Sequence, residues 1–160
     1  APKNLTSLEL IRPVIDRVLS QFKQARLIVY CGERPTLKGI DFDHIPWREG
    51  GEAEAIGQFH IGLLPLPNDP FAQGKSPIKS LQYFASGVAT IASPVGATLE
   101  IVSPERTGLL AASLGEWEQH LTHLVENSAR RAEIGAAGRS EFEQRFEANT
   151  VYQQLLGHLR

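Results

Sequence analysis

The hydrophobic positions of the chain follow two patterns, short apolar runs and longer stretches with apolar residues every three or four positions. Short apolar runs bounded by Gly or Pro are typical of buried strands, and the longer spacing is typical of amphipathic helices. The apolar runs predict strands at 27–31, 40–47, 60–66, 88–92 and 108–112. The helical spacing predicts helices at 6–22, 53–58, 77–86, 114–126, 129–146 and 149–159, with a further helix start near Thr98. Pro13 predicts a kink or a short first piece in the first of these helices.

The order of these elements predicts an α/β fold with a mostly parallel sheet. Residues 59–102 form two strand–loop–helix units in succession, so both loops lie at the carboxyl edge of the sheet, where ligands bind in such folds. The first loop carries Lys75 and Lys79 around a helix start, where Ser76 can cap the helix with Pro77 at its first position. Because a helix N-terminus with nearby lysines favours anions, the residues predict a phosphate-bearing ligand at this edge.

Composition narrows the possible partners. A length of 160 residues indicates a single domain, and 16 Lys and Arg against 18 Asp and Glu give a net charge of −2. That balance argues against a dedicated nucleic-acid or membrane-surface protein, although it allows a local basic pocket. The single Cys31 excludes an intramolecular disulfide and fits a reducing compartment. We therefore predict a cytoplasmic location, with peripheral membrane association of a longer protein as the alternative.

Other motifs are weaker. Residues 74–76 read as Gly-Lys-Ser, the end of a P-loop, but Asp69 stands where that motif needs a glycine, so an NTPase is the least favoured hypothesis. Two pairs have the spacing of metal ligands, but neither has a third ligand nearby. These pairs are Asp41 with Asp43, and His120 with His123. The residues predict no metal site.

Several segments, in order along nearly the whole chain, resemble the C-terminal donor-binding domain of GT-B-fold glycosyltransferases, specifically the retaining family 4. Residues 59–66, FHIGLLPL, resemble that family's "fDiglmPl" strand, and residues 74–87, GKSPIKSLQYFASG, resemble its "GK.p.KlLEymAaG" helix. Further segments resemble "vpvvaspvG", "EiV", "GlL" and "mGaaGR". These lie at 88–96, 100–102, 108–110 and 134–139. The resemblance implies a Rossmann-like three-layer domain.

The resemblance also implies a nucleotide-diphosphate-sugar donor and a metal-independent, cofactor-free transfer with retention of configuration. Lys3 matches a family lysine that contacts the diphosphate, and Lys75, Ser76 and Lys79 lie near the same group. Gln82 stands where the family has a Glu that holds the ribose. Gly74 stands where the family has a Glu near the transferred sugar. The loop residues expected near the sugar or phosphate are Gly96, Ala97 and Glu100, the last of which alternatively caps its own helix. Trp47 is a base-stacking candidate or a core residue.

The family has two further parts for which the 160 residues contain no matching segment. The family's first central strand would precede Ala1, so we expect either a row of unpaired backbone groups or neighbouring strands that close up. The N-terminal acceptor domain is also unmatched, so we expect residues 1–160 to be one donor-binding domain that is inactive alone, with an unknown acceptor. The apolar stripe of the last helix predicts a homodimer. The alternative function is a catalytically inactive nucleotide-binding or interaction domain, which Gly74 and Gln82 favour.

Overall fold

The computed structural model describes residues 6–158 as an α/β fold of short parallel strands and helices. Its strands are β1 (Leu27–Cys31), β2 (Phe42–Pro46), β3 (Ile61–Leu64), β4 (Ala89–Ala92) and β5 (Leu109–Leu110). Its helices are α1 (Thr6–Glu9), α2 (Arg12–Gln21), α3 (Glu52–Ile56), α4 (Pro70–Gln73), α5 (Ile78–Ala85), α6 (Thr98–Ile101), α7 (Leu114–Glu126), α8 (Ser128–Arg145) and α9 (Ala148–His158). The alternation of strands and helices confirms the predicted fold class.

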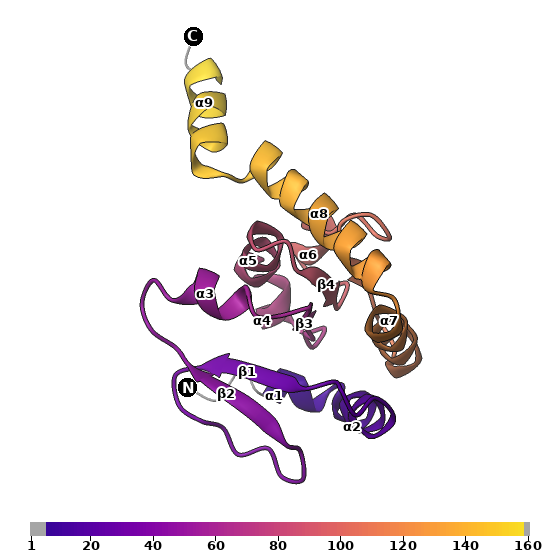
Figure 1. Cartoon of the computed structure of the whole chain (residues 1–160). Helices are drawn as coiled ribbons and strands as arrows, with labels where there is room; N and C mark the ends of the chain where they lie inside the picture. The colour runs from indigo at the N-terminus through magenta and orange to yellow at the C-terminus, as the bar shows by residue number, and fades with distance from the viewer. Residues whose placement is uncertain (1–5, 159–160) are drawn as a thin grey trace.

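The strands form two parallel sheets, not one continuous sheet. β1 pairs with β2, with Leu27 opposite Phe42. The second sheet has the order β3-β4-β5, with Ile61 opposite Ala89 and Ile91 opposite Leu109. Within residues 6–158 no strand lies hydrogen-bonded between β1 and β3, and Figure 1 shows the two sheets apart. Within these residues the two sheets therefore stay separate, and β1 and β3 do not close up against each other.

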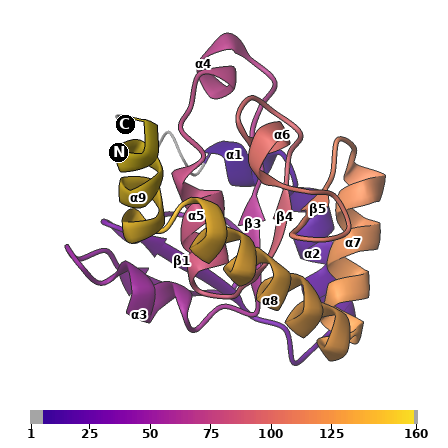
Figure 2. The same cartoon turned by 90° about the horizontal axis from the view of Figure 1, so that it is seen from above.

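Helices cover both faces of the strands, which gives the three layers expected (Figure 2). The main hydrophobic core joins α2 and α7 to the strands, through side chains that include Val14, Ile91 and Leu124, all essentially inaccessible to solvent. A second cluster on the other face joins α5, α6 and α8 around Phe84. α9 continues from the end of α8 and projects away from the body (Figure 1).

Two local expectations have different outcomes. Of the kink or short first piece expected from Pro13, the short first piece is confirmed, because α1 ends at Glu9 and α2 begins at Arg12. Asp69 has a structural role as the N-cap residue of α4, since its carboxylate accepts a hydrogen bond from the Ala72 amide at 2.8 Å. The expectation that Ser76 caps α5 is wrong. Pro77 is the N-cap residue and Ser76 lies exposed one position earlier.

The segment at 134–139 has a packing role that explains its two glycines. A Cβ atom at Gly135 would lie 2.1 Å from the carbonyl oxygen of Gly87, and one at Gly138 would lie 3.0 Å from the Phe84 ring. The Arg139 guanidinium donates a hydrogen bond to the Ala85 carbonyl. These contacts hold α8 against the end of α5, which in turn positions the loop that carries the lysines.

Candidate functional site

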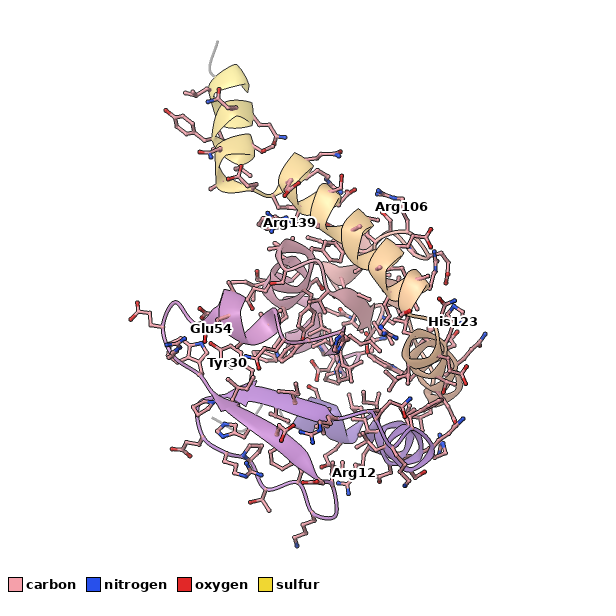
Figure 3. All side chains as sticks on the ribbon, viewed as in Figure 1. Arg12, Tyr30, Glu54, Arg106, His123 and Arg139 are labelled. Atoms are coloured by element: carbon pink, nitrogen blue, oxygen red, sulfur yellow. The ribbon has the colours of Figure 1, made fainter. Side chains whose placement is uncertain are left out.

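A cavity of about 830 Å³ lies between β1 and β3 and continues to their carboxyl ends. Its walls include Ile28 and Tyr30 of β1 and Leu63 of β3. Figure 3 places Tyr30 between β1 and α3. The chain runs outward from β1 to β2 and then returns to β3, so the strand order reverses at this cavity. Doubly wound folds bind ligands at this reversal, and the volume is within the range of small-molecule sites.

The loop after β3 brings three predicted site residues to this cavity. Lys75, Ser76 and Lys79 all line it. The Lys75 ammonium lies 5.0 Å from the centre of the Phe71 ring, a cation–π contact between α4 and the loop that follows it. Phe71 is 68% exposed. Two basic side chains therefore line the same cavity.

Lys79 is the more enclosed of the two lysines. Its Nζ donates a hydrogen bond to Gln82 Oε1 at 2.9 Å, one turn along α5. Burial lowers the pKa of Lys79, and the negative charge of Glu52 partly opposes that change. Gln82 is half-buried, and its side-chain oxygen is engaged with Lys79 rather than pointing to solvent.

Gly74 and Gly96 lie where two carboxyl-edge loops meet. Gly96 has φ +55°, and a Cβ atom there would lie 2.5 Å from the backbone oxygen of Gln73. Gly74 ends α4 in an ordinary helical conformation, and its nearest neighbours to an added Cβ lie 3.7 Å away or further. The structure therefore brings the loops after β3 and β4 together.

The remaining predicted residues lie apart from the cavity walls or outside the described part of the chain. Ala97 is the N-cap residue of the four-residue helix α6, and Glu100 lies exposed in that helix. Lys3 lies outside residues 6–158. Neither Ala97, Glu100 nor Gln82 lines the cavity.

Glu52 does not line the cavity but affects one of its lysines, and sequence reasoning did not single it out. Its Oε1 accepts a hydrogen bond from Trp47 Nε1 at 3.0 Å, and its charge acts on Lys79. Trp47 follows β2 at the carboxyl edge and is 51% exposed, so it is not a core residue. The position of Trp47 after a strand was a signal in the sequence, but nothing local to Glu52 indicated a lysine on α5.

The two pairs with metal-ligand spacing have other contacts. Asp43 forms an ion pair with Arg26 at 3.3 Å, and the His120 ring nitrogen lies 3.2 Å from the Leu110 carbonyl oxygen. In the part of the chain that the structure describes, no three His, Cys, Asp or Glu side chains lie close enough together to hold a metal ion. The same residues include no helix that is long and apolar enough to cross a membrane.

Comparison with known proteins defines the class. A family model described as "Glycosyl transferase-like" matches residues 12–157, so the chain belongs to this family. No curated protein matches the chain.

Solved structures share the fold. Sucrose-phosphate synthase from Thermosynechococcus elongatus has a TM-score of 0.66 and 17% identity, over 91% of this chain and 42% of that one. HepE of Anabaena, solved with UDP and glucose, has a TM-score of 0.67 and 16% identity, over 91% of this chain and 43% of HepE. The C-terminal domain of the group 1 glycosyl transferase LpcC from Francisella tularensis has a TM-score of 0.55 and 21% identity. The match covers 67% of this chain and 54% of that one. The chain thus has a GT-B Rossmann-like glycosyltransferase fold and spans about half or less of each of these proteins.

Proposed function

We propose that this chain is the donor-binding, C-terminal domain of a family 4 glycosyltransferase that transfers a sugar from a nucleotide diphosphate with retention of configuration and without a metal or cofactor. One observation carries the proposal. Lys75 and Lys79 line a single cavity at the carboxyl ends of parallel strands, where the strand order reverses. Membership of the glycosyl transferase-like family supports the chemistry. The UDP bound to HepE makes UDP the first nucleotide to test.

The lysines have a defined chemical role in this proposal. As the bond from the sugar to the diphosphate breaks, the leaving nucleotide gains negative charge, and positioned ammonium groups stabilise it. This stabilisation is stronger in a cavity than in water because the effective dielectric is lower. Glu52 favours the charged form of Lys79, which burial alone disfavours. The Ser76 hydroxyl and Lys3 add to the same phosphate contacts.

Ribose and sugar contacts complete the proposed donor site. The side-chain oxygen of Gln82 already accepts a hydrogen bond from Lys79. The amide NH₂ of Gln82 is therefore the group that binds a ribose hydroxyl. The backbone of Gly74, Gly96 and Ala97 and the carboxylate of Glu100 approach the sugar. A domain outside residues 1–160 binds the acceptor. Residues 1–160 alone bind the donor without turnover. We propose a cytoplasmic location for the enzyme.

A second candidate is a nucleotide-binding or interaction domain of the same fold without transfer activity. Gly74 and Gln82 favour it, because both replace acidic residues of the family pattern. The two candidates differ in the sugar contact. A donor domain binds UDP-glucose, or the matching nucleotide sugar, more tightly than the nucleotide alone, whereas a domain that kept only the nucleotide contacts binds both equally.

Calorimetric titration of UDP, GDP and ADP tests the proposed site. We expect one nucleotide to bind, and Lys79→Ala to weaken it by roughly 10- to 100-fold, the loss of one charged hydrogen bond. Lys23→Ala is the matched control, since Lys23 is exposed in the connection that enters β1 from the opposite edge. Equal affinity of both variants and the original chain, or no binding at all, would count against the site. Unchanged affinity in Gln82→Glu would exclude a ribose contact at that position.

A further inference from the structure

The charged side chains around the cavity are all of one sign. Lysine and arginine side chains line it, and in the described part of the chain no aspartate or glutamate does. Arg26 directly precedes β1 and forms an ion pair with Asp43. Arg131 donates hydrogen bonds to carbonyl groups at the end of α7, which also lies away from the carboxyl ends of the strands. The lysine and arginine side chains that line the cavity at the carboxyl edge are therefore Lys75 and Lys79.

These two lysines contact different elements. Lys79 Nζ donates a hydrogen bond to Gln82 Oε1 at 2.9 Å, and the negative charge of Glu52, at the start of α3, acts on Lys79. The Lys75 ammonium instead lies 5.0 Å from the centre of the Phe71 ring, in α4. Figure 2 shows α4 next to α6 and well apart from α3. Lys79 is thus on the α3 side of the site, and Lys75 is on the α4 side.

The α4 side is the sugar side of the proposed donor site. A Cβ atom at Gly96 would lie 2.5 Å from the backbone oxygen of Gln73, the last residue of α4, and Lys75 follows two residues later. In the proposed site the loop of Gly96 approaches the sugar, and Gln82 binds the ribose. A donor bound in this orientation has its ribose near Lys79 and its sugar near Lys75.

The diphosphate alone does not account for all of these positive charges. In a nucleotide sugar each phosphate carries one negative charge, and Lys3 and Lys79 match both in the proposed site, so Lys75 is a surplus cation. A carboxylate on the sugar would form a charge-assisted hydrogen bond with Lys75, roughly twice as strong as one between neutral groups. Glu100, in α6, is exposed and does not line the cavity, so water and salt screen its repulsion of such a group.

We propose that the donor is the nucleotide diphosphate of a hexuronic acid, and that Lys75 binds the carboxylate of its sugar. This inference rests on the proposed function and narrows the transferred sugar to an acidic one. A neutral hexose with the same ring places a hydroxymethyl group beside Lys75 in place of the carboxylate, so it binds more weakly.

Calorimetric titration of the whole chain with pairs of donors that differ only in this group tests the proposal. The pairs are UDP-glucose with UDP-glucuronate and UDP-galactose with UDP-galacturonate. If GDP or ADP is the nucleotide that binds, GDP-mannose with GDP-mannuronate or ADP-glucose with ADP-glucuronate takes their place. We expect one uronate to bind roughly tenfold or more tightly than its neutral partner.

The ratio of the two affinities within a pair separates the sugar contact from the phosphate contacts, because both donors share the phosphates. Lys75→Gln is expected to reduce this ratio to below about threefold, and Lys75→Arg, which keeps the charge, to preserve a preference for the uronate. Lys79→Ala is the matched comparison, since it is expected to weaken both donors and leave the ratio unchanged. Lys23→Ala, at an exposed position outside the cavity, is expected to change neither affinity.

Three outcomes would overturn the proposal, and they differ in what they leave standing. Equal affinity within every pair, while the nucleotide still binds, would overturn this inference and keep the proposed donor site. A preference for the uronate that survives Lys75→Gln would show that another residue binds the carboxylate. Lack of binding by every nucleotide and every donor would overturn the proposed function together with this inference.

Discussion

The positions of Gly96 and Gly74 in the candidate site differ in whether they can hold a side chain. Gly96 has φ +55°, a conformation that favours glycine, and a Cβ atom there would lie 2.5 Å from the backbone oxygen of Gln73. Gly74 has φ −86°, and a Cβ atom there meets nothing closer than 3.7 Å. The contact between the two carboxyl-edge loops therefore depends on Gly96 and not on Gly74.

This difference predicts opposite effects of the same substitution. Gly96→Ala is expected to lower the free energy of unfolding by about 1–3 kcal/mol, because the residue is strained and the loops must separate. Gly74→Ala is expected to be neutral or to raise that free energy by up to about 1 kcal/mol, because alanine restricts the unfolded chain. Urea unfolding of both variants measures the contrast. Equal effects of the two substitutions would contradict the loop contact.

At the residue scale, the sequence could predict the lysines but not the residues around them. Lys75 and Lys79 stand in a loop between a strand and a helix, and the parallel fold brings such loops to one edge. The charge of Glu52 acts on Lys79 because α3 lies against α5, a contact between elements that no local pattern encodes. The cap expected at Ser76 is wrong because the hydrogen bond from the Leu81 amide to the Pro77 carbonyl, at 3.2 Å, starts α5 one residue later.

At the scale of elements, α8 packs on the end of α5 through a backbone contact that excludes side chains at Gly135. A Cβ atom there would lie 2.1 Å from the Gly87 carbonyl oxygen and 3.6 Å from the Ala89 amide nitrogen. Neither neighbour is a flexible side chain, so the helix itself would have to move. The two glycines of the 134–139 segment thus set the distance between two helices rather than bind a ligand.

Gly135→Ala is accordingly expected to cost about 3 kcal/mol or more of the free energy of unfolding, the upper range for overpacking. Gly157→Ala is the matched control, because Gly157 is also in a helix and an added Cβ there meets nothing within 4 Å. That control is expected to be stabilising by about 0.5–1 kcal/mol. A Gly135→Ala chain as stable as the original would show that α8 does not pack as described.

A carboxylate connects α8 to the loop before β5. Glu141 is 8% exposed and accepts hydrogen bonds from Arg145 at 2.6 Å and Arg106 at 2.7 Å. Figure 3 shows Arg106 beside α8. These two hydrogen bonds, that from Arg145 first, lower the pKa of Glu141 from its ordinary value of 4.5.

The lowered pKa gives a pH dependence with a definite sign. The contribution of ionised Glu141 to stability is complete above pH 4.5, the ordinary value, and is lost as the pH falls through the lowered value in the folded protein. The difference in unfolding free energy between the original chain and Glu141→Gln is therefore expected to stay constant from neutral pH down to about pH 4.5 and to shrink between pH 4.5 and the lowered pKa of folded Glu141. Urea unfolding at several pH values measures this difference. A difference in unfolding free energy that does not change with pH would show that Glu141 does not contribute to the loss of stability in acid.

Most elements could be predicted because their apolar spacing is local, and the exceptions have physical causes. α4 is four residues long, too short to show a helical period, and depends on the side chain of Asp69. β5 has only two residues, because its pairing with β4 is limited to Ile91 and Ala92. The division of the strands into two sheets could be expected only from the resemblance, since no periodicity in the chain indicates which strands are neighbours.

At the scale of the whole molecule, the last helix is the element least covered by the rest. α9 leaves the body at the end of α8 (Figures 1 and 2). Three of its apolar side chains are exposed, Val151 by 37%, Tyr152 by 58% and Leu155 by 59%. Leu159, the last residue of the predicted stripe, lies outside residues 6–158. A cluster of exposed apolar side chains on one helix is a surface that another protein surface can cover.

The homodimer predicted from this stripe can be tested directly. Two copies that pack α9 against α9 would bury Tyr152 and Leu155 in a symmetric contact, so light scattering is expected to show the mass doubling as the concentration rises through the micromolar range. Leu155→Lys is expected to keep the chain monomeric, since it places two like charges in that contact. Gln153→Lys adds the same charge to an exposed position of α9 outside the stripe and is expected to leave the dimer unchanged. A monomer at every concentration would contradict the homodimer, and α9 would then contact another protein surface or only solvent.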